Sequence, residues 1–78
     1  MRDCVRRFAE AMDKMLDEKE PEKGVCSWCG VHKNVLVADA RMQLRKSNGL
    51  ITDEQFLRSM IHAANLCMMA YDNVVIDG

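Results

Sequence analysis

The sequence predicts an all-α fold, a small three-helix domain with helices at about residues 3–19, 34–47 and 53–74. Three observations predict it. Apolar residues recur at helical spacing in the first and last segments, a complete helix stop-and-start signal precedes the last segment, and 78 residues contain only one Pro and four Gly. A chain of this length has room for a single domain, residues 1–78.

The first helix is predicted from one apolar stripe in DCVRRFAEAMDKMLDEK. Apolar side chains recur three or four residues apart, which places them on one face of a 3.6-residue helix. They are Val5, Phe8, Ala9, Met12, Met15 and Leu16. Pro21 disfavours helical geometry in the preceding Glu20, so we expect the helix to end there.

The last helix is predicted from SNGLITDEQF. Asn48-Gly49 is typical of a left-handed cap that ends one helix, and Thr52 with Gln55 forms a capping box that begins the next. A helical wheel then groups most apolar side chains on one broad arc, which we expect to face the core: Phe56, Leu57, Met60, Ile61, Ala64, Cys67, Met68, Tyr71 and Val75.

The opposite side of the last helix carries two further apolar residues, Leu66 and Met69, among polar ones. A helix with apolar residues on more than one side requires a second packing surface. We therefore expect Leu66 and Met69, with Arg58 and His62, to contact a protein partner or another copy of the chain.

The middle segment, NVLVADARMQLRKS, fits two patterns. Leu36, Ala40 and Leu44 lie at helical spacing, and the even-numbered residues from 36 to 44 also alternate as in a strand. We favour a helix, because the segment is rich in strong helix formers and a single strand would have no pairing partner.

The stretch KGVCSWCGVH, in the connection between the first two helices, predicts the only candidate metal site. Cys26 and Cys29 have the Cys-x2-Cys-Gly spacing of a zinc knuckle, and His32 would be a third ligand. For the fourth ligand we favour Cys67, on the arc expected to face the core, over Cys4 or His62. The alternative interpretation is two partly buried free thiols packed around Trp28; a redox pair would need a preceding strand.

Charge and hydropathy exclude several classes of protein. Eleven Lys and Arg against twelve Asp and Glu give a net charge of −1, with the two signs interleaved, which argues against a nucleic-acid surface. No apolar run approaches the roughly 18 residues of a membrane span, and the charged first residues lack an apolar leader segment. We therefore expect a cytoplasmic protein with reduced cysteines.

Two stretches, VRRFAEAMDKMLDEK and HAANLCMMAYDNV, resemble helices of small phage MazG-like nucleotide pyrophosphohydrolases. That resemblance implies an all-α fold and activity on nucleoside triphosphates with Mg²⁺ bound by clustered acids. The acidic motifs depart from the family. The Glu-Glu-x-x-Glu helix falls on VLVADARMQL, which offers only Asp39, and the Glu-x-x-Asp motif falls on Ser59 and His62. Magnesium requires oxygen ligands, so this chain lacks that site.

A second stretch, LRKSNGLITDEQFLRSM, resembles the helix-turn-helix of the short C-terminal (SHOCT) motif, which implies a packed helix pair and oligomerisation. No catalytic constellation accompanies either resemblance. We therefore expect a non-enzymatic helical interaction or regulatory protein, of the accessory or phage type, that binds a protein partner or itself through a Met-rich apolar face. The alternative is a nucleotide-binding or degenerate MazG-like protein.

Overall fold

The computed structural model describes residues 1–23, 31–49 and 52–77, and these residues form three α-helices. The helices are α1 (Asp3–Lys23), α2 (Lys33–Lys46) and α3 (Asp53–Asp77). The prediction of a small three-helix, all-α fold is confirmed. The ambiguous middle segment is a helix, as favoured, and the strand alternative is wrong. Cys26, Trp28 and Cys29 lie outside the described residues.

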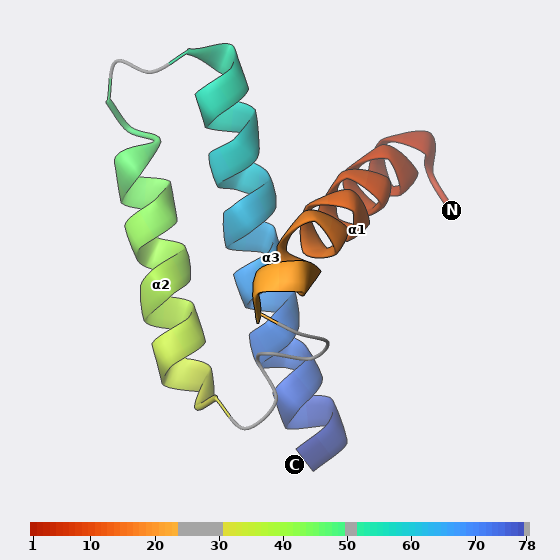
Figure 1. The fold of residues 1–78 in the computed structure, drawn as a ribbon, viewed down its shortest axis with the longest axis vertical. Coiled ribbons are helices and arrows are strands. Elements are labelled where there is room, and N and C mark those ends of the chain that lie inside the picture. Colours follow the sequence, from red (N-terminus) through yellow and green to blue (C-terminus); the bar gives the residue numbers. More distant parts are fainter. Residues whose placement is uncertain (24–30, 50–51, 78) are drawn as a thin grey trace.

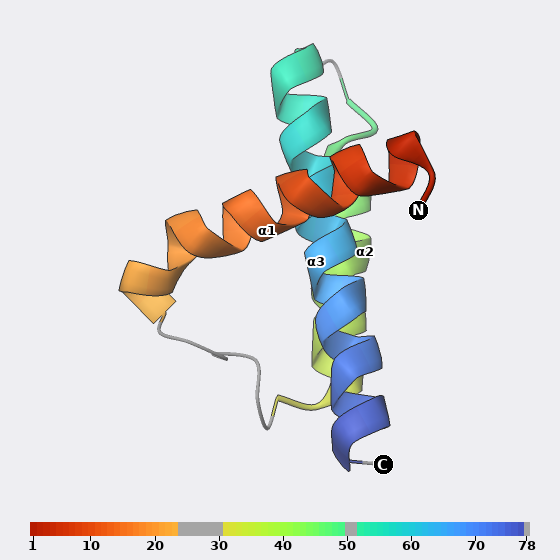
Figure 2. The ribbon, with the colours of Figure 1, turned by 90° about the vertical axis from the view of Figure 1, so that its right-hand side faces the viewer.

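The helices are arranged as a hairpin crossed by a third helix. α2 and α3 lie side by side and run antiparallel, whereas α1 crosses α3 at a steep angle (Figures 1 and 2). The first half of α1 continues past α3 and ends in the N-terminus (Figure 2). α3 is the longest element, at 25 residues, and packs against both other helices. α3 is therefore the central helix of the fold.

α1 extends beyond its predicted end. The helix runs to Lys23 and passes through Pro21, where the sequence had predicted a stop after Glu20. A proline deletes the hydrogen bond to the carbonyl four residues earlier, and close to a helix end this loss affects only the last turn. The proline signal therefore misplaced the end of the helix by about one turn.

Side-chain caps fix the ends of α2 and α3. His32 is the N-cap of α2, where its Nδ1 accepts a hydrogen bond from the Asn34 backbone N–H at 3.1 Å. The predicted capping box of α3 is confirmed. The Thr52 backbone N–H donates to Gln55 Oε1 at 3.1 Å, and the Gln55 backbone N–H donates to Thr52 Oγ1 at 3.2 Å. These bonds satisfy amides that have no partner inside a helix.

The end of α2 differs from the prediction. Gly49 does not adopt the left-handed conformation expected of it. The cap is Ser47, whose backbone is right-handed and whose hydroxyl donates to the Leu44 carbonyl at 2.6 Å. The serine therefore satisfies a terminal carbonyl that a left-handed glycine cap would otherwise satisfy.

The core lies between α2 and α3 and is small. Leu36 and Ala40 of α2 pack with Leu66 and Ala70 of α3, and Val31 and Met69 cover the edge of this cluster. Alanines at the contact let the two helices approach closely. No large side chain in the described ranges is completely buried.

α1 is held to α3 by one buried apolar residue and a few polar contacts. Met15 is 5% exposed, and Asn65 Nδ2 donates to the Met12 carbonyl at 3.2 Å. Farther along α1, Lys19 Nζ lies 3.3 Å from His62 Nδ1. Across residues 1–23, 31–49 and 52–77, none of the helices is long and apolar enough to cross a membrane.

Candidate functional site

A continuous apolar surface runs along the side of α3 that neither α1 nor α2 covers. We call it the apolar α3 face. Five of its members are large hydrophobic side chains between 44% and 71% exposed, namely Phe56, Leu57, Tyr71, Val74 and Val75. Between them lie exposed Cys67 and the half-buried Met60, Ala64 and Met68. No Asp, Glu, Lys or Arg of positions 56–75 lies on this arc of the wheel.

This surface includes nearly all of the arc that the sequence had predicted to face the core. That prediction is wrong for the single chain. α2 packs instead on the side of α3 that presents Ala63, Leu66 and Ala70, each at most 9% exposed. Small residues let helices approach closely, whereas the larger side chains on the other arc would hold them apart. The larger number of apolar residues on one side of α3 predicted that this side faces the core. α2 packs on the other side instead, where the residues are smaller.

The residues predicted to bind a partner do not form one exposed surface. Leu66 is 9% exposed and belongs to the α2–α3 core, and Met69 packs against that core. The expectation that Leu66 lies on the outer side of the helix is therefore wrong. His62 contacts Lys19, and Arg58 Nη2 lies 3.8 Å from Glu18 Oε2. All four side chains thus contact other parts of the same chain.

The predicted zinc ligands are only partly placed by the structure. Cys26 and Cys29 lie outside the described residues. His32 uses Nδ1 for the α2 cap, which leaves Nε2 as the nitrogen available to a metal. Cys67 is exposed, so the reason for preferring it as fourth ligand, a core-facing position, no longer holds. Cys4 is also exposed. Among the described residues, no three His, Cys, Asp or Glu side chains form a metal-binding group.

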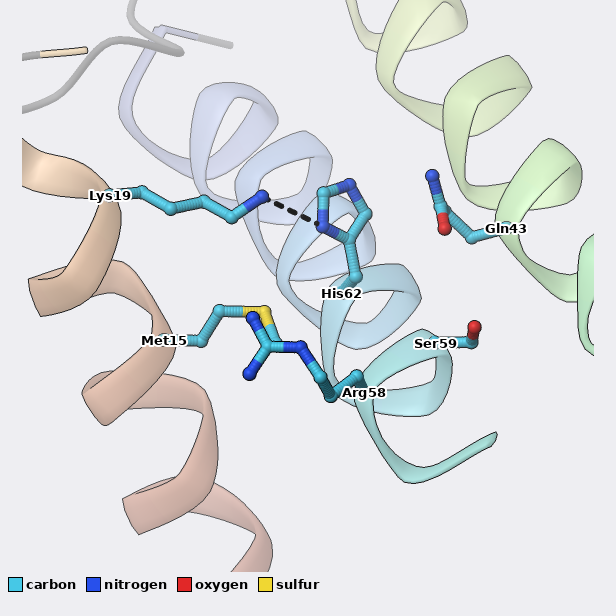
Figure 3. Close-up of a pocket in the computed structure, with 6 residues that line it drawn as sticks. All are labelled: Met15, Lys19, Gln43, Arg58, Ser59 and His62. Carbon is cyan, nitrogen blue, oxygen red and sulfur yellow. Dashed lines mark hydrogen bonds between the residues drawn. The ribbon is translucent and has the colours of Figure 1, made fainter. Parts of the chain in front are cut away.

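A shallow hollow of about 270 Å³ lies beside α3, between α1 and α2. It is lined by Met15, Lys19, Gln43, Arg58, Ser59 and His62 (Figure 3). Its wall carries two cationic side chains and an imidazole, so it suits an anion better than a cation. The sequence offered no signal for this site, because its residues come from three helices and share no spacing.

The ion pair beside this hollow is weak. Arg58 and Glu18 have side chains that are 57% and 47% exposed, and their 3.8 Å separation is close to the upper limit for such a pair. Exposed pairs of this kind contribute about 0–1 kcal/mol, because water screens the charges. Arg58 can therefore exchange Glu18 for another anion at little cost.

Comparisons with protein-family models, with curated proteins and with solved structures found no match for the chain.

Proposed function

We propose that this protein is a non-enzymatic helical interaction protein whose binding surface is the apolar α3 face. The observation that supports the proposal is the exposure of large side chains there: Leu57 is 59%, Val75 61% and Tyr71 71% exposed. Soluble proteins rarely leave so large a contiguous apolar surface in water unless it binds something. The surface predicted from the sequence, which comprised Leu66, Met69, His62 and Arg58, is replaced in this proposal by the opposite side of the same helix.

The charges around the face favour a protein over a membrane as its partner. Helices that lie on membranes carry Lys and Arg on their polar side, which attract anionic lipids. The sequence of α3 has one Arg and one His against Asp53, Glu54, Asp72 and Asp77, so the helix carries more acidic than basic residues and lacks the basic side that binding to anionic lipids requires. The methionines of the face, Met60 and Met68, are adaptable side chains that suit a protein contact.

Site-specific photo-crosslinking tests this proposal without knowledge of the partner. Tyr71 is replaced by p-benzoylphenylalanine, which keeps an aromatic ring at the centre of the face, and the cells that naturally contain the protein are irradiated. We expect a covalent adduct of defined mass. The same probe at exposed Asp39 of α2 is the matched control and should give none. Absence of an adduct at position 71, or equal adducts at both positions, would contradict the proposal.

The hollow between the helices supports a second candidate function, nucleotide binding. Lys19, Arg58 and His62 line it and can contact phosphate oxygens. A panel of nucleoside triphosphates with Mg²⁺ should then raise the melting temperature, and Lys19→Gln should abolish the shift while Lys14→Gln, at an exposed position on α1, keeps it. No shift with any nucleotide would rule this candidate out. Release of pyrophosphate would overturn the non-enzymatic proposal.

A further inference from the structure

We propose that the apolar α3 face is covered by the same face of a second copy of the chain. The two α3 helices would run antiparallel about a two-fold axis near the middle of α3, between Ala64 and Cys67. This inference rests on the proposed function and names its partner. Four observations support it: the spacing of the face, its distribution of side-chain size, its area, and the course of α1.

The spacing along the face is that of a helix-pairing seam. Successive residues at its centre lie 3, 4, 3, 4 and 3 positions apart: Leu57, Met60, Ala64, Cys67, Tyr71 and Val74. A 3.5-residue repeat keeps one line of side chains facing a neighbouring helix along its whole length. A neighbour of similar length covers a 25-residue helix best, and among the helices that the structure describes only α3 has both that length and the same seam.

Side-chain size along the seam favours the antiparallel arrangement. Large residues occupy both ends of α3 and the small Ala64 and Cys67 lie near its midpoint. A two-fold axis through that midpoint lets the backbones approach closely at the centre and places unlike large residues opposite each other. The resulting layers pair Leu57 with Val74, Met60 with Tyr71, and Ala64 with Cys67 of the second copy. Antiparallel helix dipoles also attract, whereas parallel ones repel.

The exposed area matches what a stable dimer needs. The five large members of the face are 44% to 71% exposed. With about 150 Å² for each of them when fully exposed, the lower value of the aromatic range, they leave roughly 400 Å² in water. Val5 and Phe8 of α1, at 50% and 42% exposed, add on the order of 150 Å². The half-buried residues of the face bring the total near the roughly 800 Å² per partner of a standard interface.

The course of α1 leaves the first half of the helix exposed, throughout residues 3–10. Lys19 contacts His62, and Met12 contacts Asn65. On the α3 wheel these positions lie about 180° and about 120° from Tyr71, so between Lys19 and Met12 the contacts of α1 shift around α3 toward the side of the apolar α3 face, and Figure 1 shows the first half of α1 leading away from α3. Figure 2 shows that the first half of α1 then continues past α3. A second copy against the face would give Val5 and Phe8 a surface to pack on.

Cys67 lies near the proposed two-fold axis, so a disulfide between two copies of Cys67 tests where that axis lies. It is exposed and lies two residues from the middle of α3. In the proposed dimer with an interaxial distance near 8 Å, the two Cys67 Cα atoms lie roughly 6 Å apart, within the range that a disulfide spans. Mild oxidation should join them, with two protons and two electrons passing from the two thiols to the added oxidant.

The first experiment measures mass by light scattering at tens of micromolar. We expect twice the chain mass of 8.9 kDa for the wild type. Val75→Glu and Leu57→Glu should weaken dimerisation on the order of 100-fold, because each symmetric dimer would bury two carboxylates. The matched controls Val35→Glu and Leu44→Glu change the same residue types at exposed positions of α2 and should remain dimeric. Circular dichroism confirms that each variant keeps its helices.

The second experiment oxidises the wild-type protein with diamide and digests it with trypsin. No Lys or Arg follows Arg58, so Cys67 lies in the fragment 59–78, whereas Cys4 lies in the fragment 3–6. Two copies of the fragment 59–78 joined by a disulfide can come only from two chains. We expect this species to form at least tenfold faster than the corresponding Cys4 dimer, although both cysteines are exposed.

The outcomes separate this inference from the proposed function. A wild-type monomer, or a dimer that survives both α3 substitutions, would overturn the second copy as the occupant of the face. If the probe at position 71 then still gives an adduct of another mass, the interaction function stands with a different partner. If the probe gives no adduct, both proposals fail.

Discussion

Asn65 combines deep burial with incomplete hydrogen bonding. It is 3% exposed and donates from Nδ2 to the Met12 carbonyl, while its Oδ1 has no partner in the part of the chain that the structure describes. A buried polar atom without a partner costs about 1–3 kcal/mol. We therefore infer that Asn65 adds little to stability, and that its one hydrogen bond fixes where α1 crosses α3.

Substitutions of Asn65 should show how its hydrogen bond and its unpaired buried oxygen offset each other in the free energy of unfolding. Asn65→Leu removes both the hydrogen bond and the unsatisfied oxygen, so we expect the free energy of unfolding to stay within about 1 kcal/mol of the wild type. Asn65→Asp is similar in size and buries a carboxylate instead, which should cost about 2–4 kcal/mol at neutral pH. Chemical denaturation measures both. An Asp variant as stable as the wild type would show that the crossing of α1 does not bury this position.

A second prediction at the scale of single residues concerns zinc binding by Cys26 and Cys29. Zinc bound by Cys26, Cys29 and His32 would contribute folding free energy, on the order of 10 kcal/mol for a structural site. Native mass spectrometry should then show one zinc that is lost on acidification, and a chelator should unfold the protein. Free thiols predict no bound zinc and a loss of only about 1–2 kcal/mol for Cys26→Ser with Cys29→Ser. Because His32 Nδ1 caps α2, metal loss should also loosen the start of that helix.

At the scale of single elements, side-chain hydrogen bonds fix the start of α3. The reciprocal hydrogen bonds of Thr52 and Gln55 satisfy two amides, and Asp53 and Glu54 follow in the first turn, where the helix dipole favours negative charge. By contrast, the first half of α1 is exposed throughout residues 3–10 and is stabilised locally by the Arg6–Asp3 pair at 2.7 Å. The start of α3 is thus fixed by contacts within the chain, whereas the stability of the start of α1 depends on what covers it.

Removing the cap of α3 gives a direct measurement. Thr52→Ala deletes the side-chain oxygen that accepts from the Gln55 amide, and we expect a loss of about 1 kcal/mol in the free energy of unfolding. For a domain of this size that corresponds to about 4–8 °C in melting temperature. Thr52→Ser keeps the oxygen and is the control. Equal melting temperatures for the alanine and serine variants would contradict the assigned role.

At the scale of the whole molecule, few apolar side chains of the described residues are buried. Among the described residues, the core below 10% exposed consists of three alanines together with Met15, Leu36 and Leu66, whereas a larger number of big apolar side chains stay in contact with water. A 78-residue chain is already short for a self-sufficient core. Association through the apolar α3 face would add the missing burial.

Association coupled to stability predicts a melting temperature that depends on protein concentration. We expect the wild-type value to rise by about 3–5 °C for a tenfold increase in concentration, because mass action favours the folded dimer. Val75→Glu, from the exposed end of the face, should show a much smaller change over the same tenfold range, because its dimer forms only at higher concentration. A wild-type melting temperature that does not change with concentration would mean that stability does not depend on self-association.

The candidate site could be predicted from the sequence only in part. The apolar arc of the last helix was recognisable from spacing alone, but its assignment to the core was wrong because spacing does not show which arc the neighbouring helix covers. Leu66 was placed outside and is buried, while Tyr71 was placed inside and is exposed. The hollow lined by Lys19, Gln43 and Arg58 had no sequence signal, since it depends on how three helices cross.

The sequence by itself determined where the helices of this protein form, and the tertiary structure decided which side of each helix is buried. Helix periodicity and the Thr52–Gln55 cap are local properties, set by contacts within about four residues, so they can be recognised without a fold. The choice between two apolar sides of α3 depends instead on size complementarity with α2, through Ala40, Ala63 and Ala70. That complementarity joins residues far apart in the chain, and it leaves the larger apolar side of α3 uncovered.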